Sequence, residues 1–166
     1  MENLTLSPAN LESCSFPDKV KGYSEARRVL KSGGHFFFNA WDRISDNEFA
    51  DVVTQALGKF FPHDPPLFMA RTPHGYHDVK TIRQDLAAAG FTKISIDTVE
   101  YKSVAASPRE PAIAYCQGTP LRNEIEKRDA SMLESATQAA SEALARRFGT
   151  GRIEGRIAAH VVSAAG

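Results

Sequence analysis

Two histidines, His74 and His77, stand three residues apart in a proline-rich segment and could do acid–base or metal chemistry. Imidazole titrates near neutral pH and is the commonest metal ligand in proteins. A zinc site needs three or four protein ligands, and the sequence nearby adds only His63 or Asp64. We therefore predict no metal site. The pair is either an acid–base pair or part of a polar loop in front of a helix.

A tryptophan and an aspartate, Trp41 and Asp42, close a short apolar run over residues 35–41. This run reads as a strand, and ligands of open α/β sheets bind outside the carboxyl ends of strands. Trp41 and Asp42 are therefore candidates for the wall of a substrate or cofactor cleft. The alternative is an aromatic side chain that covers the sheet, followed by an exposed loop acid.

The segment over residues 62–77 contains four prolines and reads as a long irregular loop. Loops of this length in compact domains are often functional. We expect the loop to gate a substrate, with Tyr76 pointing into the cleft.

Three strands and five to six helices are expected to position these residues. The strands are predicted at about 35–41, 92–104 and 153–163, and the first is so apolar that it indicates a strand buried on both faces. Helical spacing and capping residues predict helices over about 17–32, 45–60, 78–89, 107–118, from 119 onward, and 130–147. The predicted fold class is α/β, with a small three-stranded mixed sheet.

The composition indicates one domain and excludes partners that are recruited by bulk charge. The 166 residues carry 20 basic and 20 acidic side chains, so the net charge is zero, which argues against nucleic acid and membrane surfaces. Only two cysteines are present, which indicates no disulfide framework and a cytoplasmic setting. We expect a loose N-terminal arm over residues 1–15 and a single α/β domain over 16–166.

Three stretches carry a family resemblance. Residues 25–36, Glu-Ala-Arg-Arg-Val-Leu-Lys-Ser-Gly-Gly-His-Phe, resemble the E-x-x-R-V-L-K-P-G-G-x-f signature of class I S-adenosylmethionine-dependent methyltransferases, with Ser32 in place of the proline. The group concerned is type 11, which is ubiquinone/menaquinone-biosynthesis-like. Residues 72–76 and 86–91 resemble its later patterns t-P-x-g-Y and l-x-x-A-G-F.

This resemblance implies a partial Rossmann-like methyltransferase fold. The three predicted strands would be the fifth, sixth and seventh of the family's sheet, with the seventh antiparallel between the other two. It also implies S-adenosylmethionine as cofactor. The family binds this cofactor through its first half, and no G-x-G-x-G loop occurs in this sequence. We therefore expect a truncated, C-terminal half that does not bind the cofactor alone.

The resemblance also implies that the helices between the last two strands shape the acceptor pocket, which makes Tyr115 a pocket candidate beside Trp41, Asp42, His74 and Tyr76. Ordinary helix packing is the alternative. Cys116 has no basic partner nearby in the sequence and is not expected to be a nucleophile. No catalytic or cofactor-binding residue is assigned.

Two functions follow. The first is S-adenosylmethionine-dependent methyl transfer to a small molecule, completed by a cofactor half from another chain. The second is a non-enzymatic, dimeric module that binds a small molecule or a partner. Because the strand His35–Trp41 would lose its family neighbour, we expect a homodimer joined edge to edge at this strand or by a swapped segment.

Overall fold

The computed structural model describes residues 18–166. Their contacts divide the chain into two compact units, here called unit 1 and unit 2. Unit 1 contains residues 18–43, 72–99 and 158–166, and unit 2 contains residues 44–71 and 100–157. The single domain expected over residues 16–166 stays a prediction, and the arm expected over residues 1–15 lies outside the described residues.

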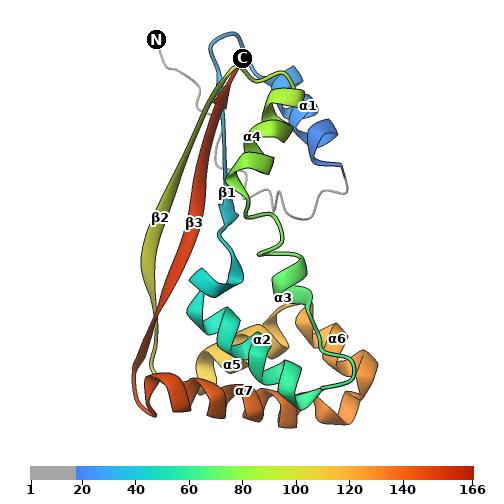
Figure 1. Ribbon diagram of the computed structural model, residues 1–166, viewed down its shortest axis with the longest axis vertical. Coiled ribbons are helices and arrows are strands. Elements are labelled where there is room, and N and C mark those ends of the chain that lie inside the picture. Colours follow the sequence, from blue (N-terminus) through green and yellow to red (C-terminus); the bar gives the residue numbers. More distant parts are fainter. Residues whose placement is uncertain (1–17) are drawn as a thin grey trace. The chain divides into compact units, whose positions relative to one another are not determined.

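Three strands form one sheet (Figure 1): β1 (His35–Trp41), β2 (Lys93–Ala105) and β3 (Ile153–Ala165), in the order β1-β3-β2. β1 and β3 pair antiparallel, from His35 opposite Ala165 to Trp41 opposite Ala159. The predicted α/β class, the three strands, and the place of the last strand between the other two are confirmed.

Two predictions about the sheet are wrong. The sheet is antiparallel rather than mixed, because β3 separates β1 from β2 and the two strands that run the same way never pair. β1 is buried on one face only: Phe36, Phe38 and Ala40 are buried, whereas His35, Asn39 and Trp41 are exposed. This alternation is typical of an antiparallel sheet with helices on one face.

Unit 1 packs two helices on one face of the strands, α1 (Lys19–Val29) and α4 (Val79–Ala88). The carboxylate of Asp18 caps α1 and that of Asp78 caps α4, each by accepting hydrogen bonds from main-chain N–H groups of the first turn. The core between them and the sheet is rich in aromatic side chains, which are Tyr23, Phe36, Phe38, Tyr76 and Phe91. The aliphatic side chains of Ile82, Leu86 and Val162 belong to the same core.

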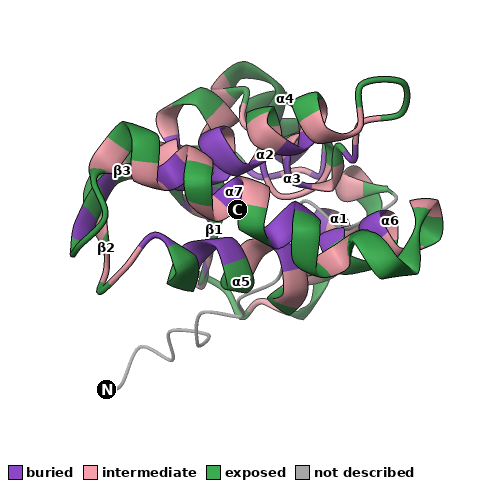
Figure 2. Ribbon diagram, turned by 90° about the horizontal axis from the view of Figure 1, so that it is seen from below, coloured by how far each residue is buried: buried purple, intermediate pink, exposed green. Residues whose placement is uncertain are grey.

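Unit 2 is mostly helical: η2 (Ile44–Asp46), α2 (Glu48–Phe60), α3 (Phe68–Arg71), α5 (Arg109–Gly118), α6 (Leu121–Arg128), η3 (Ala130–Met132) and α7 (Leu133–Phe148). Its core gathers apolar side chains from most of these helices, including Phe49, Leu57, Leu121, Ile125 and Leu144. Figure 2 shows how buried positions alternate with exposed ones along the helices of each unit. The described residues thus hold seven α-helices instead of five to six, because α3 lies in the segment predicted as an irregular loop.

Ser45 and Glu48 have the S-x-x-E spacing of a helix capping box, but they do not form one. Ser45 lies in η2, and Asn47 is the residue before α2. Glu48 instead accepts a hydrogen bond of 2.7 Å from the main-chain N–H of Arg156 and one of 2.6 Å from the Arg147 guanidinium. A contact across the fold therefore replaces the local cap.

No helix between residues 18 and 166 is both long and apolar enough to cross a membrane. The compartment expected from the cysteine usage stays a prediction.

Candidate functional site

The end of β1 meets the segment before α4 within unit 1. Nδ1 of His74 lies 2.8 Å from the carbonyl oxygen of Asp42, and the rings of Trp41 and His74 have centroids 6.0 Å apart. The structure therefore brings together three of the five residues proposed from the sequence. Trp41 is 44% exposed and His74 only 5%, so the indole presents an open surface next to a buried imidazole.

His160, on β3, joins this group from the core side of the sheet. Its Nε2 lies 2.9 Å from the carbonyl oxygen of His77 and 3.4 Å from Oδ1 of Asp42, and its Nδ1 lies 2.9 Å from Oγ1 of Thr98. Because a carbonyl oxygen only accepts hydrogen bonds, Nε2 of the neutral ring carries the proton and Nδ1 accepts from the Thr98 hydroxyl. We call Trp41, Asp42, His74, His77 and His160 the histidine cluster.

His160 and Thr98 are not indicated as site residues by the sequence patterns. Along the strand 153–163, His160 falls in the polar phase together with Glu154 and Arg156. In the structure, the odd-numbered residues Ile153 and Gly155 are buried at the start of β3. After Ile157 the alternation changes, and the even-numbered residues Ala158, His160 and Val162 are buried instead. Only a shift of phase within the strand could have placed His160 on the buried face.

The other two imidazoles of the cluster are oriented by carbonyl groups as well. Nδ1 of His74 donates to Asp42 and Nδ1 of His77 donates to the carbonyl oxygen of His74, at 2.8 Å each. In their neutral form, both rings therefore keep a lone pair on Nε2 that can accept a proton or a hydrogen bond. Orientation by a main-chain carbonyl is a common way to fix the reactive nitrogen of a histidine.

Burial lowers the pKa of His74 below the usual value for an imidazole. The positive charge that His77 can carry lowers it further, while the hydrogen bond to the Asp42 carbonyl and the Asp42 charge act in the opposite direction. Desolvation is the largest of these causes. His74 is therefore neutral at neutral pH and acts as a hydrogen-bond acceptor rather than as a cation.

Tyr76 lies in the core of unit 1. It is 7% exposed, its hydroxyl donates a hydrogen bond of 2.8 Å to Oδ2 of Asp85, and the Lys19 ammonium lies 4.7 Å from its ring centroid. Burial raises its pKa far above the usual phenol value. Tyr76 thus ties the segment before α4 to both helices of unit 1.

Tyr115 belongs to unit 2, where its half-buried ring packs against the helical core. Burial raises its pKa. The neighbouring Cys116 is fully buried, and burial raises the pKa of its thiol to about 11. A thiol that stays protonated is a poor nucleophile.

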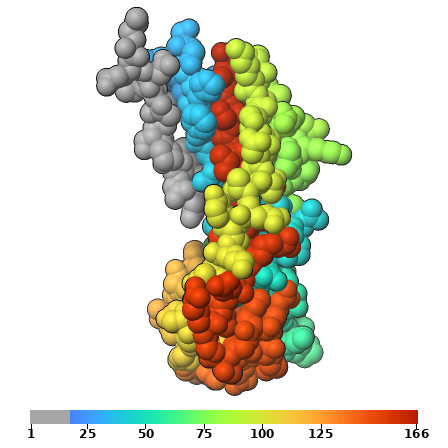
Figure 3. Space-filling model, turned by 90° about the vertical axis from the view of Figure 1, so that its left-hand side faces the viewer, coloured from blue at the N-terminus to red at the C-terminus, as the bar shows by residue number. Residues whose placement is uncertain are grey.

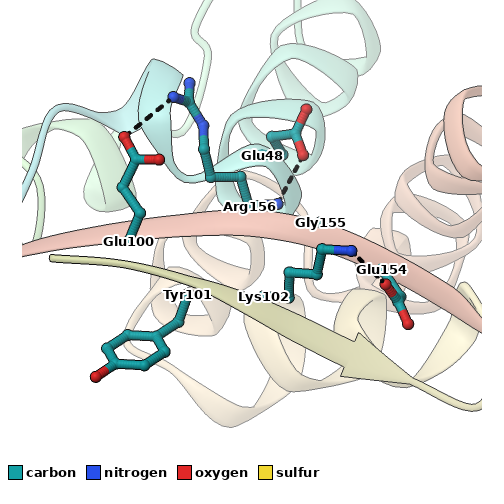
Figure 4. A pocket seen from close by; sticks show the side chains of 7 residues that line it. All are labelled: Glu48, Glu100, Tyr101, Lys102, Glu154, Gly155 and Arg156. Atoms are coloured by element: carbon teal, nitrogen blue, oxygen red, sulfur yellow. Dashed lines mark hydrogen bonds and ion pairs between the residues drawn. The ribbon is translucent and has the colours of Figure 1, made fainter.

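Unit 2 also has a hollow of about 560 Å³ that the sequence did not suggest (Figure 4). Its lining is Glu48, Glu100, Tyr101, Lys102, Glu154, Gly155 and Arg156. The charged side chains are paired: Lys102 with Glu154 at 3.0 Å, Arg156 with Glu100 at 3.5 Å and with Asp46 at 2.6 Å, and Glu48 with Arg147. A ligand would have to compete with these ion pairs, so the histidine cluster is the better candidate site.

The described residues do not fit S-adenosylmethionine. A glycine turn that holds a nucleotide-like cofactor follows a strand and opens a helix. The glycines with positive φ between residues 18 and 166 are Gly33, Gly90 and Gly149, and each of them follows a helix and precedes a strand. Within this part of the chain, no group of three or more His, Cys, Asp or Glu side chains could hold a metal ion either.

Comparison of the sequence with models of protein families gives no match. Comparison with curated proteins gives no match either.

Proposed function

We propose that residues 18–166 form the acceptor-binding part of an S-adenosylmethionine-dependent methyltransferase fold, and that a small molecule binds beside Trp41 at the histidine cluster. The observation that carries this proposal is the sheet, in which the last strand lies antiparallel between the two before it. The position of Trp41 and Asp42 at the carboxyl end of β1 supports it further, because β1 would be one of the parallel strands of the complete methyltransferase sheet, and ligands bind outside the carboxyl ends of such strands.

The chain's own residues would bind and orient the acceptor. The exposed indole of Trp41 offers a flat apolar surface for a ring, and Nε2 of His74 offers an acceptor for a hydroxyl proton. A planar molecule with a hydroxyl group, such as a phenol, fits both features. Methyl transfer depends mostly on holding the acceptor in line, which is the task that this part of the chain would supply.

Trp41 is the only tryptophan of the chain, so its fluorescence reports on the site. We expect catechol to quench it saturably. Dimethoxybenzene, which has no hydroxyl proton, should bind several-fold more weakly. His74→Ala should weaken catechol binding by about fivefold, as expected for the loss of one hydrogen bond of about 1 kcal/mol.

Tyr101→Ala, in the hollow of unit 2, serves as the control and should leave the titration unchanged. Quenching that rises linearly with catechol, equally in the parent chain and in His74→Ala, would be collisional and would contradict a site at the cluster.

The cofactor part of the proposal has its own test. Because residues 18–166 lack a suitable glycine turn, we expect no micromolar binding when the purified chain is titrated with S-adenosylmethionine in a calorimeter. Micromolar binding would show that this chain holds the cofactor, against the proposal.

A second candidate function is a non-enzymatic, dimeric module that binds a small molecule or a partner through the same unit. The charge-free strand β1, which pairs with β3 alone among the described strands, favours it, because open strand edges pair with other chains. Light scattering after size exclusion should show a dimer, and a stable monomer would exclude this candidate.

A further inference from the structure

The two outer strands of the sheet differ in how they are protected against pairing. β2 carries charged side chains at Lys93, Asp97, Glu100 and Lys102, whereas β1 has no Lys, Arg, Asp, Glu or Pro. Charges and prolines are the usual devices that keep an exposed strand edge from pairing with another chain. β1 lacks these devices, which favours pairing at this edge.

The main-chain groups that face the edge can be identified from the ladder with β3. The N–H of Asp42 donates to the carbonyl oxygen of Ala158, 3.1 Å away, so this residue pair is hydrogen-bonded. Hydrogen-bonded pairs alternate along an antiparallel ladder. Residues 36, 38 and 40 therefore also bond to β3, and the N–H and C=O groups of Phe37, Asn39 and Trp41 point toward the edge.

We propose that β1 pairs with β1 of a second copy of this chain, antiparallel about a two-fold axis at Asn39. The two sheets would join into one continuous sheet. Asn39 then faces Asn39 of the partner copy, and Phe37 of each copy faces the partner copy's Trp41. This inference rests on the second proposed function, dimerisation through β1, and adds its register and contacts.

The side chains select this register. Shifting the axis by one residue in either direction places Phe37 or Trp41 opposite Asn39, so that aromatic rings face an amide. With the axis at Asn39, two aromatic pairs flank a pair of amides, each of which can both donate and accept. The exposed His35, Asn39 and Trp41 and the half-buried Phe37 share one face of β1. Figure 3 shows β1 in light blue beside β3 in red.

Substitutions that replace the facing aromatic residues Phe37 and Trp41 by residues of opposite charge test the register. Phe37→Glu and Trp41→Lys should each turn the dimer into a monomer at the same concentration, measured by light scattering. Mixed in equal amounts, the two variants should form a heterodimer, because the introduced carboxylate at position 37 faces the introduced ammonium at position 41, and the native pair remains at the other end. Val161→Glu is the matched control, since it adds the same charge on the same face but on the inner strand β3.

A further variant at an exposed position tests the interface even if Phe37→Glu or Trp41→Lys fails to fold. Asn39 is exposed, so Asn39→Arg should fold with an unchanged far-ultraviolet circular dichroism spectrum. It should weaken the dimer about tenfold at low salt and less at high salt, because like charges meet across the axis and are screened.

The remaining outcomes separate the claims. A monomeric parent chain would overturn both the inference and the second proposed function. A dimer that survives Phe37→Glu, Trp41→Lys and Asn39→Arg would show an interface away from β1. Single variants that are monomeric and do not recombine when mixed would overturn the register alone.

Discussion

His74 is a buried imidazole whose environment opposes its charge. The unfolded chain takes up a proton at this residue near pH 6.5, but burial holds the pKa of His74 lower in the folded chain. Between these two values the unfolded state binds more protons, so the free energy of unfolding falls as the pH drops below about 6.5. Once the pH is below the pKa of His74 in the folded chain, this residue causes no further decrease in the free energy of unfolding.

We therefore expect the urea midpoint to decrease as the pH is lowered from 7 to 5. His74 can change the free energy of unfolding by at most about 1.4 kcal/mol per pH unit in this range. His74→Gln should flatten this slope, and His63→Gln, at an exposed position, should not. Equal slopes in the parent chain and in His74→Gln would show that another group dominates in this range.

Gly155 allows the ring of Phe49 to approach the backbone of β3. A Cβ atom at this position would lie 2.7 Å from Cε1 of Phe49, which is buried. Gly155→Ala should therefore destabilise the fold by about 1–3 kcal/mol, as is typical of overpacking, measured by urea unfolding. Gly151→Ala is the control, because nothing lies within 4 Å of the added atom.

The candidate site could be predicted only in part. Trp41 and Asp42 were found because the end of an apolar run marks the end of a strand, and His74 because histidine is a rare type in a proline-rich segment. His160 was not found, since its burial depends on a change of alternation in β3 at Ile157. No local pattern shows that Tyr76 lies in a core.

At the level of elements, α4 is attached to the sheet of unit 1 by two fully buried side chains, Ile82 and Leu86. Leu86→Ala removes apolar contacts and leaves a cavity, so it should cost about 2–5 kcal/mol. Gln84→Ala, on the exposed side of the same helix, should change the free energy of unfolding by less than about 0.5 kcal/mol. Similar losses in the two variants would mean that α4 is not anchored through this face.

The order and bounds of most elements could be predicted, because helical spacing, glycine ends and apolar runs are local signals. Five helices and all three strands lie within a few residues of their predicted bounds, and α6 begins close to its predicted start. The short α3 was missed because prolines surround it. The burial of β1 was overestimated, because a run of phenylalanines reads as apolar on both faces although Phe37 is only half-buried.

At the scale of the whole molecule, β2 and β3 each contribute residues to both units. We therefore expect the chain to unfold in one transition, as a single domain does. Trp41 belongs to unit 1, while most helical residues belong to unit 2. The urea midpoints from Trp41 fluorescence and from far-ultraviolet circular dichroism should coincide, and two separate midpoints would contradict a single domain.

The pairing of β1 with β3 also has a consequence during protein synthesis. Trp41 and its partner Ala159 are separated by about 120 residues, so β3 leaves the ribosome about 6–24 s after β1 at ordinary rates of elongation. During this delay Phe36, Phe37 and Phe38 have no strand of the described sheet to pair with. We therefore expect the nascent chain to expose β1 as an unpaired apolar segment, which is the kind of segment that chaperones protect from aggregation.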